Sequence, residues 1–317
     1  MSLFHRLWQH QRFLMRISIL HAVMIPVVAL LYVLYPFELS GVNGWVKPLK
    51  FEISSVIYAV SIAWIATLLP TTSRWYKLAA GIIAASLIIE TSLITLQAAR
   101  GTISHYNIST PLDTAIYSIM ATFISILATA NIICLCVVLF QKTLSPVIRI
   151  ACSWGLAIAV VGMVAGVLMT SVNVSPSQLH TMQVDQKAPA SYGAHSVGVD
   201  DGGPGLPFVG WSTVGGDLRV GHFVGLHGLQ VMPLFALLLL SGRLFRRNTS
   251  AQHLQLVQLL GIAYTAGTGL LIWQAWRGQS VIAPDLLSIG CAAAIGTVVL
   301  VGAWSIVRSG SAKQTTV

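Results

Sequence analysis

Residues 77–99 read KLAAGIIAASLIIETSLITLQAA, and after Lys77 the only charged side chain in this stretch is that of Glu90. A helix rises about 1.5 Å per residue, so about 20 apolar residues cross the hydrocarbon core of a bilayer. An ionisable group in such a setting is costly and by default marks a functional site. The stretch therefore predicts a membrane span and places a candidate site on it.

The composition of the whole chain is that of an integral membrane protein. Of its 317 residues, 55% are hydrophobic and 9% are charged, with a mean hydropathy of +0.78, whereas about a quarter of a soluble domain is charged. Eight candidate spans lie near residues 15–35, 51–69, 77–99, 114–140, 148–172, 218–241, 255–276 and 284–307. We predict an all-α integral membrane protein in which residues 1–317 form a single domain, a bundle of about eight transmembrane helices.

The basic residues predict the orientation of the chain, because Lys and Arg are enriched in cytoplasmic loops. With the N-terminus inside, inner segments hold twelve of these residues and outer segments hold six. The twelve are Arg6, Arg12, Arg16, Arg74, Lys77, Lys142, Arg149, Arg243, Arg246, Arg247, Arg308 and Lys313. The six are Lys47, Lys50, Arg100, Lys187, Arg219 and Arg277. The bias predicts cytoplasmic N- and C-termini, which an even number of spans also requires.

The net charge of +9 does not point to nucleic acid. The basic residues flank the apolar runs instead of gathering on one surface, so we interpret them as topology signals. The partners that we expect are the lipid bilayer and a small-molecule or lipid ligand that arrives from the extracytoplasmic side. No nucleic-acid partner is expected.

One long extracytoplasmic loop is predicted over residues 173–217. Residues 200–207 read DDGGPGLP, and Gly and Pro at this density predict turns and irregular backbone. Loops longer than about 15 residues without structure of their own tend to be functional or disordered. Phe208 and Trp211 predict that the second half of the loop packs back onto the bundle.

His227 is the predicted partner of Glu90. Counting from the outer end of each span, both residues lie about 13 Å deep, and His222 lies about 6 Å deep. A carboxylate in lipid is neutralised or finds a partner. If spans 77–99 and 218–241 are neighbours, Glu90 and His227 meet, and we predict that they are the catalytic acid–base residues.

Other polar side chains outline an outward-opening cleft between these two spans. Their helical spacing places Gln97 near the face of Glu90, and Gln230 on the face of His227. The candidate substrate-binding residues are Lys50, Gln97, Arg100, His105, Arg219 and Gln230. Lys50, Arg100 and Arg219 would hold an anionic group, and Lys47 and Glu52 could add a third wall.

Metal binding is a sharper hypothesis, based on His222 and His227. The two are five residues apart, about 140° around a helix, which suits a metal less well than an i, i+4 pair. A divalent metal such as zinc would therefore need a bend at Pro233 or a further ligand from His105, His195 or Glu90. Haem is a weaker candidate, because both deep histidines share one span.

Structural roles are open for several of these residues. Glu90 with His227 could be a buried structural pair. Asp217 is expected to cap the helix that begins at residue 218, since Asp after two glycines suits that position. His21 is expected near the inner end of its span, as a polar group whose hydrogen bonds are satisfied.

Residues Trp45–Phe51, Gln97–Asn107 and Gly202–Gln230 resemble recurring segments of a family of uncharacterised bacterial multi-span inner-membrane proteins. The resemblance implies a bacterial inner-membrane setting for this chain. It implies no activity, cofactor or catalytic residue.

Three functions follow from these features. The first is a membrane-embedded enzyme or metal site that uses Glu90 and His227, favoured because nearly every unusual polar residue lies in the outer half. The second is a proton-coupled solute transporter, for which Asn131, Gln258 and Tyr264 supply only a sparse polar route to the inside. The third is a binding or assembly protein in which Glu90 and His227 stabilise the fold.

Overall fold

The computed structural model describes residues 2–69, 73–170, 173–242 and 248–314. Within these residues the chain is all-helical apart from two small two-stranded ribbons, with 72% helix in ten helices. Eight of the helices are long and apolar enough to cross a membrane, which confirms the predicted number of spans for this part of the chain.

The eight long helices follow the predicted spans closely. They are α2 (Arg12–Leu34), α3 (Val46–Leu68), α4 (Arg74–Ala99), α5 (Pro111–Leu139), α6 (Pro146–Leu168), α8 (Leu218–Leu240), α9 (Ser250–Trp276) and α10 (Leu286–Gln314). Helix α3 begins five residues before the predicted span at 51. Its first turns contain Lys47 and Lys50, which hydropathy alone assigns to a loop.

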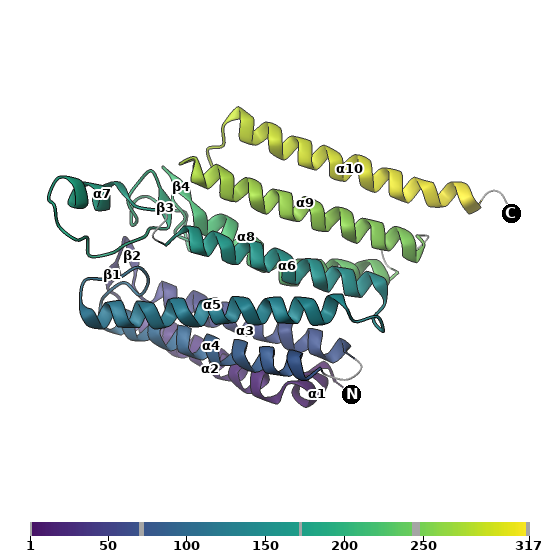
Figure 1. The fold of residues 1–317 in the computed structure, drawn as a ribbon, viewed down its shortest axis with the longest axis horizontal. Helices are drawn as coiled ribbons and strands as arrows, with labels where there is room; N and C mark the ends of the chain where they lie inside the picture. The colour runs from purple at the N-terminus through teal and green to yellow at the C-terminus, as the bar shows by residue number, and fades with distance from the viewer. Residues whose placement is uncertain (1, 70–72, 171–172, 243–247, 315–317) are drawn as a thin grey trace.

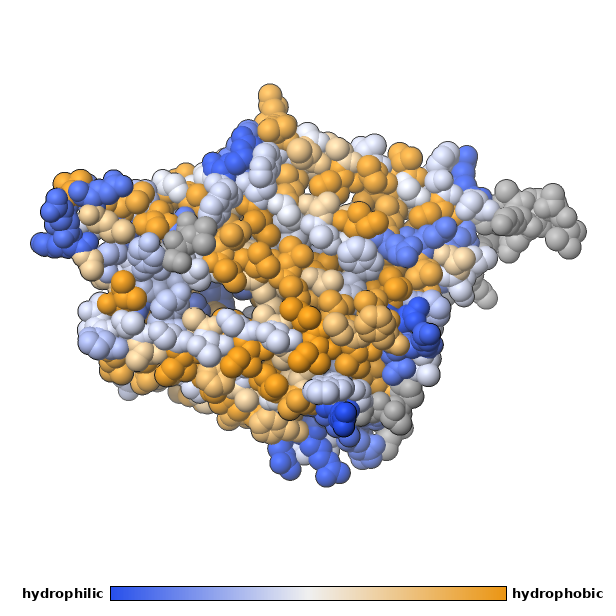
Figure 2. Space-filling view, in the orientation of Figure 1, coloured by the Kyte–Doolittle hydropathy of each residue, from blue (hydrophilic) through white to orange (hydrophobic). Residues whose placement is uncertain are grey.

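The long helices lie side by side along the long axis of the molecule (Figure 1). Both chain ends lie at one end of this bundle, which we call the terminal end. The short helix α1 (Leu3–His10) is also there. The long connections gather at the opposite end, which we call the loop end. Hydrophobic residues cover the middle of the visible face and hydrophilic ones gather toward the two ends (Figure 2), as expected for a bilayer-spanning bundle.

Glycines bring α6 and α8 into close contact. A Cβ atom on Gly162 of α6 would lie 2.6 Å from the backbone nitrogen of Leu226, and one on Gly225 of α8 would lie 2.5 Å from the Cα atom of Gly162. Small residues allow two backbones to approach in this way within a membrane. Helix α8 packs on α6 and α9 and touches α3, while α4 packs on α2, α3 and α5. The two spans that were expected to enclose a cleft, α4 and α8, are therefore not packed against each other along their length.

Side-chain caps set where several helices begin. The hydroxyl of Thr110 accepts a hydrogen bond from the backbone N–H of Asp113 at the start of α5, and Ser145 caps α6 in the same way. Asp217 caps α8 as predicted, because its Oδ1 accepts from the backbone N–H of Arg219 at 3.0 Å. Each cap satisfies one of the free donors in the first turn.

The long connection between α6 and α8 has structure of its own. It contains the helix α7 (Pro176–Gln183) and the strand β3 (Ser196–Val197), which pairs with β4 (Gly216–Asp217). A second ribbon, β1 (Glu38–Leu39) with β2 (Val42–Asn43), joins α2 to α3. Helix α7 opens with a capping box formed by Ser175 and Gln178, a short signal in the sequence.

The same connection packs onto the segment between α4 and α5. The backbone N–H of Tyr192 donates to the carbonyl of Tyr106 at 2.8 Å, and that of Ile108 donates to Ala190 at 2.9 Å. Trp211 packs on Phe223 of α8 with ring centroids 5.6 Å apart, as expected. Phe208 does not pack back as predicted, since 95% of it is exposed.

Candidate functional site

The carboxyl group of Glu90 lies at the centre of the polar residues of the loop end. Glu90 is only 4% exposed, on the face of α4 that turns into the bundle. Its Oε1 atom lies 3.4 Å from Nε2 of His105, and its Oε2 atom is buried without a hydrogen-bond partner in the described structure. A buried carboxylate oxygen without a partner is unfavourable for stability alone, so the arrangement points to chemistry.

His105 connects Glu90 to the first turn of α3. Its Nδ1 atom lies 3.1 Å from Nζ of Lys47 and 3.0 Å from the hydroxyl of Ser104. An ammonium group can only donate, so Nδ1 is the acceptor and Nε2 carries the hydrogen that faces Glu90. The three side chains form a continuous row of donors and acceptors that ends on the carboxylate.

Burial lowers the pKa of His105 well below its usual value, and the positive charge of Lys47 and the nearby His195 and His222 add to this effect. The imidazole is therefore neutral near pH 7, in the tautomer that the contact with Lys47 selects.

The segment between α4 and α5 is fixed in place by Asp113. Its carboxylate accepts hydrogen bonds from Arg100 at 2.6 Å and Gln97 at 3.0 Å, and from the hydroxyl of Thr110 at 2.6 Å. Arg100 also donates to the side chain of Gln97. The structure thus gives Gln97 and Arg100, predicted to bind substrate, partners that hold the segment carrying His105.

The long connection adds a second histidine with a carboxylate partner. The Nδ1 atom of His195 lies 2.7 Å from Oδ2 of Asp201, which also accepts from the backbone N–H of His195. The ring of Tyr106 lies between the two histidines, with centroids 5.8 Å from His105 and 5.3 Å from His195.

The pKa of Asp201 lies below its usual value. Burial alone would raise this pKa, but the interaction with His195 and the backbone N–H bonds from His195 and Ser196 outweigh that effect. Asp201 is therefore ionised at neutral pH and orients the ring of His195.

Two further cations of the predicted site lie beside this cluster. Arg219 forms an ion pair with Asp217 at 2.6 Å and also donates to the carbonyl of Gly210 at 2.6 Å. Lys50 donates to the carbonyl of Val209 at 3.2 Å. Neither Lys47 nor Lys50 has a carboxylate within ion-pair distance among the described residues. The two ammonium groups therefore lack a direct ion-pair partner among the described residues.

The expected contact between Glu90 and His227 is not formed. The Nδ1–H group of His227 donates to the carbonyl of Phe223 in its own helix at 2.8 Å, and its ring lies on the Phe223 ring with centroids 4.1 Å apart. Gln230 bonds to Ser61 of α3 at 2.9 Å. The reason for the difference is the packing of α8 on α6, which turns His227 away from α4.

The two histidines of α8, predicted to bind a metal, each donate one ring N–H to a backbone carbonyl. The Nδ1–H group of His222 donates to the carbonyl of Gly162 at 2.8 Å, which leaves one free nitrogen on each ring. Across the described residues, no three or more His, Cys, Asp or Glu side chains are placed to hold one ion. The described residues thus bring no third ligand to His222 and His227, and metal or haem binding stays a prediction.

A buried pair that was not predicted joins α2 and α3. The Nδ1 atom of His21 lies 2.6 Å from Oε2 of Glu52, and the two residues are 2% and 3% exposed. Glu52 was expected to face the mouth of the site, and His21 was expected near the inner end of its span. The register of two antiparallel helices is not visible in sequence spacing, which explains the error.

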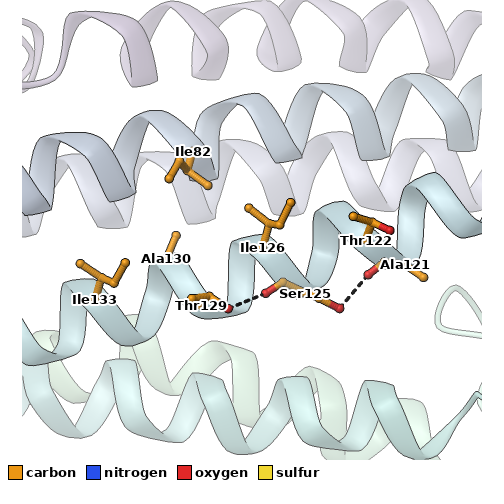
Figure 3. Close-up of a pocket in the computed structure, with 8 residues that line it drawn as sticks. All are labelled: Ile82, Ala121, Thr122, Ser125, Ile126, Thr129, Ala130 and Ile133. Atoms are coloured by element: carbon orange, nitrogen blue, oxygen red, sulfur yellow. Dashed lines mark hydrogen bonds between the residues drawn. The ribbon is translucent and has the colours of Figure 1, made fainter.

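A shallow pocket on the flank of the bundle lies away from this cluster. Its volume is about 540 Å³, and it is lined by α5 with one residue of α4 (Figure 3). The lining residues are Ile82, Ala121, Thr122, Ser125, Ile126, Thr129, Ala130 and Ile133. The hydroxyls of Ser125 and Thr129 donate to carbonyls one turn earlier in α5. The pocket carries no ionisable group.

Comparison of the chain with protein-family models, with curated proteins and with solved structures finds no match.

Proposed function

We propose that this protein is a membrane-embedded enzyme that performs acid–base chemistry on an anionic substrate at the loop end. The observation that carries the proposal is the row from Lys47 through His105 to Glu90, with contacts of 3.1 and 3.4 Å. The row reaches Oε1 of Glu90, while Oε2 is buried and makes no hydrogen bond to any described residue. His105 takes the place that was predicted for His227.

Glu90 is the proton-accepting group in this proposal. A carboxylate that is withdrawn from water, with one oxygen free, can take a proton from a bound substrate. His105 is the positioning residue, since its Nε2–H group orients Oε1 and leaves Oε2 for the substrate. The cations Lys47, Lys50 and Arg219 favour a substrate that carries a carboxylate or phosphate group.

The direction of access follows from the basic residues. The positive-inside bias favours cytoplasmic termini, so the loop end would face the extracytoplasmic side. We infer that the setting is a bacterial inner membrane and that the substrate, a small molecule or a lipid, enters from outside.

A proton-coupled carrier is the second candidate, because Glu90 is a buried carboxylate that lies 3.4 Å from His105 in the connection at the loop end. Two of the three residues expected on a polar route to the inside have structural partners, and the third, Gln258, is exposed. Asn131 is held by Tyr58 at 2.8 Å and by the carbonyl of Leu156 at 3.0 Å, and Tyr264 donates to Val224. They offer no second half of a transport route, so the enzyme remains first.

Binding of inorganic phosphate and of acetate, measured by calorimetry in two buffers of different ionisation enthalpy, tests the proposal. The protein is held in lipid nanodiscs. We expect binding heats that depend on the buffer, because Glu90 exchanges a proton when an anion binds. The Glu90→Gln variant should still bind but lose the dependence. The exposed Glu38 gives a matched control, Glu38→Gln, that should behave like the unchanged protein.

Other outcomes assign other roles. Binding heats that are independent of the buffer in both proteins would refute proton exchange at Glu90. Proton-driven accumulation of labelled phosphate in proteoliposomes would identify a carrier. A Glu90→Gln variant that changes only in thermal stability would make Glu90 a structural residue.

A further inference from the structure

Residues 204–213 form a compact unit in the connection before α8, which we call the tip loop. The loop closes on itself, because Gly205 and Ser212 form an isolated bridge and the backbone N–H of Leu206 donates to Trp211 at 2.8 Å. The backbone N–H of Thr213 also donates to the carbonyl of Pro204 at 3.0 Å. These bonds within the loop allow it to move as one piece.

The far end of the tip loop is held to the bundle by two cations. Lys50 of α3 donates to the carbonyl of Val209 at 3.2 Å, and Arg219 of α8 donates to the carbonyl of Gly210 at 2.6 Å. Phe208 gives no anchorage, since it is 95% exposed, and its φ of 65° is a conformation that a bulky residue rarely adopts. The position of this end therefore depends on the two cations and on the contact of the adjacent Trp211 with Phe223 of α8.

A backbone carbonyl is the weak partner of these cations: Lys50 has no other, whereas Arg219 also pairs with Asp217 through Nε and Nη2. Hydrogen bonds from these cations to carboxylate or phosphate oxygens are about twice as strong as bonds between neutral groups. Lys50 makes no other hydrogen bond in the described structure, and Nη1 of Arg219 makes none. Both side chains therefore have donors available for an anion.

We infer that Lys50 and Arg219 form the subsite for the carboxylate or phosphate group of the ligand, and that the tip loop is a lid occupying this subsite until the ligand arrives. The inference rests on the proposed function and deepens it. The anion replaces the carbonyls of Val209 and Gly210, and the lid leaves the two cations. Trp211 moves with the lid, and its contact with Phe223 is lost.

A spin label at position 208 reports the lid directly. The Phe208→Cys variant is prepared after replacing the accessible Cys136 and Cys291 by Ala, and is labelled in nanodiscs. Phe208 is exposed, so the label does not disturb the packing. We expect its mobility to rise on titration with inorganic phosphate. A label at exposed Leu179 of α7, in the same connection but outside the tip loop, should not respond.

A variant of Lys50 tests whether the label at position 208 reports opening of the tip loop or a general gain of mobility in the protein. The Lys50→Met variant should show a mobile label at 208 without phosphate, and should bind phosphate about tenfold more weakly or worse, since a charged hydrogen bond is lost. Lys50→Arg keeps a donor and should restore the closed lid. Lys77→Met removes an exposed lysine from the first turn of α4 and should leave both readouts unchanged.

The possible outcomes test the lid, the subsite and the proposed function separately. If calorimetry shows phosphate binding but the label at 208 keeps its mobility, the lid is wrong and the proposed function stands. If Lys50→Met leaves phosphate affinity unchanged, the assignment of the subsite is wrong. If neither phosphate nor acetate binds the unchanged protein, the proposed function fails and the lid fails with it.

Discussion

The Nζ atom of Lys47, in the first turn of α3, lies 3.1 Å from Nδ1 of His105 in the connection between α4 and α5. The ammonium group can only donate, so the contact is favourable while the imidazole is neutral. A proton on Nδ1 would set two donors and two positive charges against each other. The contact thus ties the protonation of one loop residue to the packing of the loop end.

We predict that this protein loses stability as the pH falls below about 6.5. The pKa of His105 is lowered in the folded protein by burial first and by the charge of Lys47 next. Below about pH 6.5 the unfolded chain binds a proton that the folded chain refuses, so the free energy of unfolding decreases. The thermal midpoint should therefore fall between about pH 7.5 and pH 5.5.

The control for this prediction is the removal of the imidazole. His105→Gln should lessen the acid-induced fall of the midpoint, whereas His180→Gln, at an exposed position of α7, should leave it unchanged. Equal pH dependence in all three proteins would show that His105 does not sense the pH.

Replacing Glu90 by Gln should retain the fold and lose the chemistry. The carboxylate has one unpartnered, buried oxygen, so a neutral amide of the same shape removes a buried charge. We expect a free energy of unfolding within about 1 kcal/mol of the original, and the loss of the buffer-dependent part of the binding heat, because an amide does not take up a proton near neutral pH. Thermal unfolding beside the buffer-dependent calorimetry measures both. A large loss of stability would point to a structural carboxylate.

The number of spans and the position of Glu90 within one of them could be predicted from the sequence, because both depend on composition. A span shows itself as a long apolar run, and one carboxylate in such a run stands out wherever its neighbours lie. Asp217 could be placed at the start of α8 for a similar reason, since capping is decided by residues next to each other in the chain.

The partner of Glu90 could not be predicted, because it comes from a connection and not from a span. His105 reaches the carboxylate only because Asp113 holds the segment around it. His227 has the right depth but the wrong direction, since Gly162 and Gly225 turn α8 toward α6. Depth follows from counting residues, whereas direction follows from how helices pack.

Adding a methyl group at Gly162 should separate α6 from α8. The new Cβ atom would lie 2.6 Å from the backbone nitrogen of Leu226 and 3.0 Å from the Cα atom of Gly225, and backbone atoms cannot give way as a flexible side chain does. We expect Gly162→Ala to cost about 1–3 kcal/mol in the free energy of unfolding. Denaturation in mild detergent measures this cost.

Gly267 supplies the matched control for that variant. A Cβ atom there would meet nothing within 4 Å, so Gly267→Ala should be neutral or should stabilise helix α9 by up to about 1 kcal/mol. Equal effects at the two positions would mean that the glycines of α6 do not set the helix contact.

Removing one member of the His21–Glu52 pair should lower the free energy of unfolding strongly. Replacing both members by apolar residues should change it little. The two side chains are 2% and 3% exposed and 2.6 Å apart, so Glu52→Leu alone leaves a polar ring buried without its partner. We expect this change, or His21→Leu alone, to cost about 3–5 kcal/mol. The double variant His21→Leu, Glu52→Leu should recover most of that loss, because two apolar side chains suit a helix contact inside a membrane. A double-mutant cycle on thermal unfolding gives the coupling energy. If the double variant loses proton exchange at Glu90 while its stability recovers, the pair serves the site and not only the packing of α2 on α3.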